Sequence, residues 1–394
     1  MNQSGGLSGI ERLRRGHTRA TIVGVLGFVV LAAGGFGNPD QFFRSYLPAF
    51  VFVFGIALGS LALLMLQHMT GGAWGMMIRR ILEAGARTLP VVALMFLPIA
   101  LGLSRLFIWA VPEVVAKDAI LQQKALYLNT GFFYARAAVY FTVWIALALT
   151  LSRWSAAQDA QAPAGDERRF RIVSGLGLVL YGITVTFASV DWIMSLDPHW
   201  FSTIFGMLLM AGQALGALAF AVAILAASAE DEPFAGRLNA THLHDLGKLL
   251  FALVMFWAYL SFSQFLIIWA GNLPEEIPWF IERLHGVWQY VALGLVVGHF
   301  ALPFLLLLSR DLKKNRRALA SMALLILAMR FVDTYWLITP AFKTEGFPMH
   351  WMDLAAIVGL GGIWLAVFFR LLQSRERLPM NDPYFKDAVA HGKH

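Results

Sequence analysis

The amino-acid sequence predicts an all-α, polytopic membrane protein with about ten transmembrane helices. Of the 394 residues, 58% are hydrophobic and only 14% are charged, and the mean hydropathy is +0.65. Soluble domains carry about 25% charged residues, so a water-soluble globule of this composition lacks the charges to cover its surface. The same composition excludes intrinsic disorder. The chain also contains a series of apolar runs of the length that crosses the hydrocarbon core of a bilayer, roughly 20 residues.

Ten such runs are present, at 20–36, 47–66, 86–104, 131–151, 172–194, 200–227, 247–270, 287–308, 318–339 and 352–372. The loops between them are short, so we expect one integral membrane domain over 1–394 with tails at 1–19 and 373–394. Asp197 and Pro198 have the residue types of an N-cap and a first helical position, which predicts that the sixth helix begins there.

The segment Gly72–Ala84 has apolar residues at helical spacing, with Arg79, Arg80 and Glu83 on the other face. This pattern predicts an amphipathic helix that lies on the membrane surface.

The basic residues are distributed asymmetrically between the two ends of the runs. With an even number of spans, 23 of the 31 Lys and Arg residues fall on the side of the tails. Six fall on the other side, namely Arg44, Arg105, Lys117, Lys124, Arg283 and Lys343. The positive-inside rule therefore places both tails in the cytoplasm, and the net charge of +7 is a signal of topology that requires no nucleic acid partner.

Ionisable residues inside the apolar runs are candidates for function because they are costly to insert into a membrane. Arg330 and Asp333 share one helix face, and we interpret them either as a neutralised packing pair or as part of a polar relay or quinone-site wall. Asp191, Arg330 and Asp333, with Asp353 as a fourth member, would form an outward half-channel for protons if spans five, nine and ten faced one interior. The full set of proton-path candidates is Arg136, Asp191, His299, Arg330, Asp333 and Asp353.

Several cofactor classes are excluded or disfavoured. The chain has no cysteine, so it holds no thiolate-ligated Fe–S cluster or zinc and no covalently attached c-type haem. His285 and His299 share a helix face about 21 Å apart, a spacing suited to two b-haems, but no facing run supplies a matching pair. We therefore expect no metal and no haem on this chain. Ser261, Ser263 and Gln264 are either interhelical hydrogen-bonding residues or the lining of a pathway.

Five stretches of the chain resemble the membrane subunits of alternative complex III, a quinol:cytochrome c oxidoreductase. They are Ala57–Gly75, Asp191–Thr203, Phe262–Glu275, His299–Asn315 and Asn381–Pro383. Within this family the chain is most similar to the ActF type of subunit, which is similar to the NrfD and polysulfide-reductase membrane anchors.

The resemblance implies two four-helix bundles with peripheral helices, in the inner membrane of a bacterium. It implies partners, namely an NrfD-like sibling, an Fe–S subunit and haem c subunits, which carry the redox centres. The implied role is a scaffold and proton-conducting subunit, with quinol or lipid as possible ligands. Because the Asp191 stretch is shared with the quinol-binding sibling, Asp191, Trp192 and His199 are candidates for a second quinone pocket.

Two other functions remain as alternatives to a non-catalytic coupling subunit. The chain would be a quinol-oxidising subunit in its own right if it bound the substrate. A secondary transporter is disfavoured, because such proteins often show inverted repeats and paired broken helices, and neither is visible in the sequence.

Overall fold

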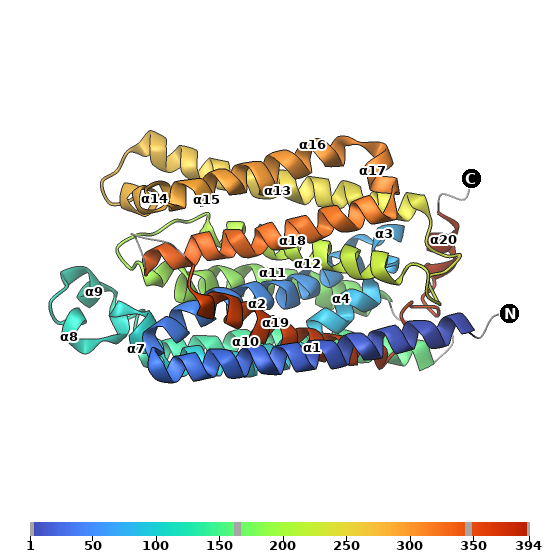
Figure 1. The fold of residues 1–394 in the computed structure, drawn as a ribbon, viewed down its shortest axis with the longest axis horizontal. Helices are drawn as coiled ribbons and strands as arrows, with labels where there is room; N and C mark the ends of the chain where they lie inside the picture. The colour runs from blue at the N-terminus through green and yellow to red at the C-terminus, as the bar shows by residue number, and fades with distance from the viewer. Residues whose placement is uncertain (1–3, 161–166, 343–348, 392–394) are drawn as a thin grey trace.

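The computed structural model describes residues 4–160, 167–342 and 349–391, and these residues form helices and no β-strand. Ten of the helices are long and apolar enough to cross a membrane. They run side by side along the long axis of the molecule (Figure 1). The predicted all-α, multi-pass architecture is confirmed, and each of the ten apolar runs lies within or overlaps one span.

Most spans are single helices, whereas the third and eighth are built from shorter pieces. The single helices are α1 (Ser4–Gly37), α2 (Pro39–Thr70), α10 (Thr130–Ala160), α11 (Glu167–Trp192), α12 (Phe205–Ser228), α13 (Ala240–Gly271), α18 (Arg316–Ile338) and α19 (Trp351–Gln373). The third span consists of α4 (Arg79–Ala86), α5 (Leu89–Met95) and α6 (Leu97–Leu101), and the eighth of α15 (Trp288–Gly294), the π-helical turn η3 (Leu295–Ala301) and α16 (Leu302–Leu308).

Short helical elements connect the spans at both ends of the molecule. At one end lie α7 (Leu103–Leu106), η1 (Ile108–Ala110), α8 (Pro112–Val115), α9 (Ala119–Lys124), η2 (Met194–Leu196), α14 (Ile277–Leu284) and η4 (Thr339–Ala341). At the other lie α3 (Ala73–Met76), α17 (Arg310–Lys314) and α20 (Phe385–Ala390).

The spans pack as two groups of four with α1 and α19 at the periphery. In the first group, α2 packs on α4, α5 and α11, and α10 packs on α5 and α11. In the second, α12 and α18 pack together, α13 packs on α12 and α16, and α18 packs on η3. The two groups meet where α2 contacts α12 and α18 and where α11 contacts α12. Within its most apolar window α2 is 83% buried and α12 is 78% buried, against 11% for α1, so the α2–α12 contact is the centre of the fold.

Small residues allow the closest helix contacts. A Cβ added at Gly59 of α2 would overlap the backbone oxygen of Gln213 in α12. At the periphery, a Cβ at Gly27 of α1 would lie 2.8 Å from the backbone nitrogen of Gly359 in α19. Membrane helices use such small residues to bring their backbones together, because lipid provides no hydrophobic driving force for association.

Two predicted boundaries are wrong. Helix α1 begins at Ser4 and its apolar span at Gly9, so the first span starts before the predicted position 20 and the described part of the segment before residue 20 is helical. The sixth span begins at Phe205, not at Asp197–Pro198. Asp197 instead follows the 3-10 turn η2, and Trp200 packs against Trp279 with ring centroids 4.6 Å apart. The chain therefore crosses the end of the bundle before α12 starts.

The start of α1 and the C-terminal segment lie at the same end of the molecule (Figure 1). Arg12 of α1 and Arg377, beyond α19, both approach Asp231, at 3.2 and 3.8 Å. The start of the first span and the segment that follows the last span therefore meet at the end rich in basic residues, as an even number of crossings requires. Lys343 and Lys393, which the count of charges included, lie outside the described residues.

Candidate functional site

Asp191 and Arg136 form a buried ion pair between α11 and α10. The carboxylate accepts hydrogen bonds from Nε and Nη2 of Arg136, at 2.9 and 2.8 Å, and from the hydroxyl of Tyr140 at 2.9 Å. The guanidinium lies over the ring of Tyr127, 3.9 Å from its centroid. Asp191 is fully buried, so this contact joins two helices whose pairing the sequence could not reveal.

Arg330 and Asp333 form a second ion pair, within α18, as their spacing predicts. Arg330 donates to Asp333 through Nη1, and both side chains are buried. The guanidinium fills the space beside Gly212 of α12, where a Cβ would overlap it. A cavity of about 10 Å³ lies beside Arg330 and Gln213, which is room for about one water molecule.

His299 lies in the π-helical turn η3 and is fully buried. Neither of its ring nitrogens has a hydrogen-bond partner among the described residues. Its ring stands edge-on to Trp257 of α13, with centroids 4.1 Å apart. Short π-helical turns inside α-helices often occur at functional sites, and the two unpaired ring nitrogens of His299 are available for hydrogen bonds to a water molecule or a ligand.

A pocket of about 710 Å³ lies beside Asp333, in the second group of helices. Its walls are mainly apolar and aromatic side chains of α12, α13, α14, α15, η3 and α18, among them Trp257, and Asp333 is one of the few polar residues in the lining. Tyr259, Phe262 and Val296 form exposed parts of the wall, so the pocket opens on the flank of the bundle. Its volume is in the range of small-molecule sites, roughly 300–1,000 Å³.

Gln264 supplies the pocket with an unpaired polar group. It is only 3% exposed, and neither its amide oxygen nor its amide nitrogen has a partner among the described residues. Buried amides are normally hydrogen-bonded. Of the two interpretations from the sequence, interhelical hydrogen bonding or pathway lining, this geometry favours the lining.

Arg283 holds α14 against the pocket wall. Its guanidinium donates to the backbone oxygens of Trp279 and Leu337, both at 3.0 Å, and lies 3.7 Å from the centroid of the Trp279 ring. Trp279 and Leu337 both line the pocket. From the sequence, Arg283 was only one of six basic residues on the side opposite the tails.

The remaining predicted residues lie elsewhere. Asp353 accepts hydrogen bonds from Ser45, Tyr335 and the backbone of His350, at 2.5, 2.8 and 2.7 Å, and so completes the N-terminal capping box of α19. The three carboxylates of the predicted half-channel therefore have separate sets of partners.

Asp191, Trp192 and His199 do not form one pocket in this structure. Trp192 is buried among aromatic rings, 5.1 Å from the Phe54 centroid. His199 is exposed at the loop end, where Nε2 lies 2.7 Å from Asp118. The backbone N–H of Leu121 is the main cause of a lowered pKa at Asp118, and hydrogen bonds from His199 and Ile120 add to it.

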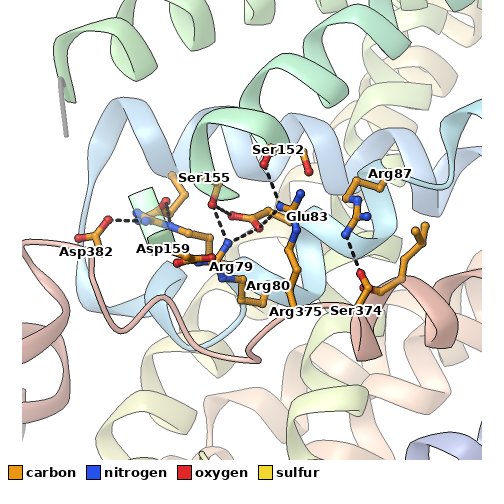
Figure 2. A network of polar contacts seen from close by, with 12 residues as sticks. Arg79, Arg80, Glu83, Arg87, Ser152, Ser155, Asp159, Ser374, Arg375 and Asp382 are labelled. Atoms are coloured by element: carbon orange, nitrogen blue, oxygen red, sulfur yellow. Dashed lines mark hydrogen bonds and ion pairs between the residues drawn. The ribbon is translucent and has the colours of Figure 1, made fainter. Parts of the chain in front are cut away.

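The opposite end of the bundle holds a polar network that the sequence did not predict (Figure 2). Arg80 donates to Glu83 and Ser155, both at 2.6 Å, and to Asp159 at 2.5 Å. Arg79 pairs with Asp382 of the C-terminal segment. The predicted surface helix at Gly72–Ala84 is therefore wrong: Arg79, Arg80 and Glu83 are buried, because α10 and the C-terminal segment cover the face that was expected to meet water.

Comparison with protein-family models and with curated proteins finds no match for this chain.

Proposed function

We propose that the chain is a membrane subunit of a respiratory quinol:electron-acceptor oxidoreductase of the alternative complex III type. In this role it has no redox centre of its own, and haems and Fe–S clusters are on partner subunits. It would exchange protons through the group formed by Arg330, Asp333 and His299. The membrane would be the inner membrane of a bacterium.

One observation supports this proposal above the others. Asp333 is ion-paired inside a membrane bundle, yet it also forms part of the wall of a large apolar pocket. Ionisable residues inside membrane proteins commonly mark proton relays, ion pathways or ligand sites. Asp191, by contrast, is enclosed by Arg136 and Tyr140, an arrangement that suits a packing role.

The proposal is tested first by identifying the proteins that co-purify with the chain. A tagged copy, extracted in mild detergent, should co-purify with bands that stain for haem. A chain that purifies alone from membranes with active quinol oxidation would contradict membership of such a complex.

The proton role is tested by Asp333→Asn in the assembled complex. We expect a roughly tenfold or larger fall in quinol turnover, in the range of lost general acid–base catalysis, or less proton release per electron, in particles of normal composition. Asp353→Asn is the matched control, because its carboxylate caps a helix, so we expect poorer assembly but normal specific turnover. Full assembly with full turnover and proton release in Asp333→Asn would remove this carboxylate from the mechanism.

A second candidate function, binding of the quinol by this chain, is favoured by the pocket at Gln264. An apolar body would contact the aromatic walls, and a ring oxygen would pair with the free amide. Photolabelling with an azido-quinone should then modify α13 or α18, and Gln264→Leu should reduce the labelling. Ser263→Ala, one residue away and outside the pocket lining, should not. Equal labelling in both variants would exclude the site.

A further inference from the structure

A second pocket, of about 510 Å³, lies at the basic end of the bundle between α1, α12 and α19. Its lining combines arginines of α1 with apolar side chains. Leu13 and Phe369 form part of the apolar lining, and Leu13 is buried. A Cβ at Gly16 would be in ordinary van der Waals contact with the Phe369 ring, at 3.4 Å, so a larger side chain there would occupy part of the pocket.

Three arginines of α1, at positions 12, 15 and 19, line this pocket. At 100° per residue they lie within about 60° of one another, and they extend over ~10 Å of the helix axis. All three are exposed. Arg19 has no hydrogen bond or ion pair among the described residues, so its guanidinium is available to a ligand.

The acidic residues of the pocket do not balance its positive charge. Asp231 is buried and is shared between Arg12 and Arg377, and Glu11 pairs with Arg15 at 3.2 Å. Within the lining itself, three guanidinium groups face two carboxylates. The excess suits a ligand with a single negative charge, such as a phosphodiester.

The same face of α1 continues as an exposed apolar stripe. Val23, Leu26 and Val30 follow Arg19 at helical spacing and are 50%, 60% and 49% exposed. Arginines at headgroup depth followed by an apolar track match the two parts of a phospholipid, and basic pockets between membrane helices are known to take anionic lipid headgroups. We propose that this pocket binds one anionic phospholipid, with its phosphodiester at Arg15 and Arg19 and its acyl chains along Val23, Leu26 and Val30.

The site is tested on the purified full-length chain by native mass spectrometry with dioleoylphosphatidylglycerol, dioleoylphosphatidylcholine or inorganic phosphate. We expect retention of the anionic lipid, weak retention of the zwitterionic lipid, and no displacement by millimolar phosphate. The double variant Arg15→Gln/Arg19→Gln should weaken binding of the anionic lipid about 30-fold, which is ~1 kcal/mol for each arginine.

Two further variants separate this site from general charge attraction. Arg14→Gln removes an exposed arginine from the opposite face of the same turn and should leave binding unchanged. Gly16→Leu fills the pocket without changing charge and should weaken binding. The proposal is overturned if Arg14→Gln weakens binding as much as the double variant, if both lipids bind equally, or if phosphate alone competes. It is equally overturned if, in native membranes, this face of α1 cross-links to a protein and not to lipid.

Discussion

The carboxylate of Asp191 accepts three hydrogen bonds, two from Arg136 and one from Tyr140, and has almost no contact with solvent. A buried ion pair of this kind contributes little relative to apolar packing, but removing one partner leaves a charge without compensation at a cost of about 3–5 kcal/mol. The energetic role of Asp191 is therefore to neutralise Arg136.

We predict that Asp191→Asn lowers the free energy of unfolding by about 3 kcal/mol, because Arg136 then stays buried without its counter-charge. The double variant Asp191→Asn/Arg136→Gln should recover part of this loss, since no unpaired charge remains. Thermal unfolding of the purified variants measures both effects. A double variant as unstable as the sum of the single Asp191→Asn and Arg136→Gln variants would contradict this interpretation.

Asp118 leads to a prediction about how the local stability of the segment around α9 depends on pH. It caps α9 by accepting from the N–H groups of Ile120 and Leu121, and these bonds and His199 lower its pKa. Because the pKa is lower in the folded state, the contribution to stability is present above the ordinary carboxyl pKa and is lost as the pH falls through the lowered value. Amide hydrogen exchange within 112–128, corrected for the intrinsic pH dependence of exchange, should therefore show weaker protection at pH 3 than at pH 5. Asp118→Asn should abolish most of this difference, and an unchanged pH dependence would refute the role of Asp118.

The sequence was sufficient to identify Arg136, Asp191, His299, Arg330, Asp333 and Asp353, because each is an ionisable residue in an apolar run. It was not sufficient to pair Arg136 with Asp191, since 55 residues separate them. Gln264 was found as a polar residue in a span, but only the packing of α13 against α14 and α18 shows that its amide faces a pocket without a partner.

At the scale of elements, the ten spans were predictable because length and hydropathy are local properties. The network around Arg80 was not, since its burial depends on α10 and on a C-terminal segment about 300 residues away. The amphipathic pattern correctly identified the polar face of 72–84, but it predicted that this face would be exposed to water. In the folded chain that face is covered by Ser155 and Asp159 and by the segment containing Asp382.

The packing of α1 on α19 leads to a prediction about glycine. A Cβ at Gly27 would press on the backbone of Gly359, and one at Gly359 would lie 2.7 Å from the backbone nitrogen of Phe28. Gly27→Leu should therefore push α1 away from α19. Gly182→Leu in α11 is the matched control, because a Cβ at Gly182 meets nothing within 4 Å.

The separation can be measured by thiol cross-linking, since the chain has no cysteine of its own. Cysteines at His17 and Ala366 report on the contact, because the His17 ring lies 2.9 Å from the backbone oxygen of Ala366. Gly27→Leu should reduce the cross-linking yield several-fold, and Gly182→Leu should leave it unchanged. An undiminished yield in Gly27→Leu would show that α1 is not held by this glycine contact.

At the scale of the whole molecule, the bundle has one end rich in arginine and an opposite end formed by α7 to α9 and α14. The start of α1 and the C-terminal segment both lie at the basic end, where Arg12 and Arg377 share Asp231. The described ends of the chain thus lie at one end of the bundle, whereas the side of the membrane that they face is a prediction from the distribution of charge.

The positive-inside rule makes that choice, because Lys and Arg in short loops resist transfer across the membrane. We predict that reporters fused after Asn2 and after His394 are both active in the cytoplasm. A reporter inserted after Lys117, in the loop at the opposite end of the bundle, should give the reverse signal and serves as the matched control. A periplasmic signal from reporters at both termini would show that the topology is inverted. They would also move the proposed lipid site to the other leaflet, because Arg12, Arg15 and Arg19 lie at the same end as the N-terminus.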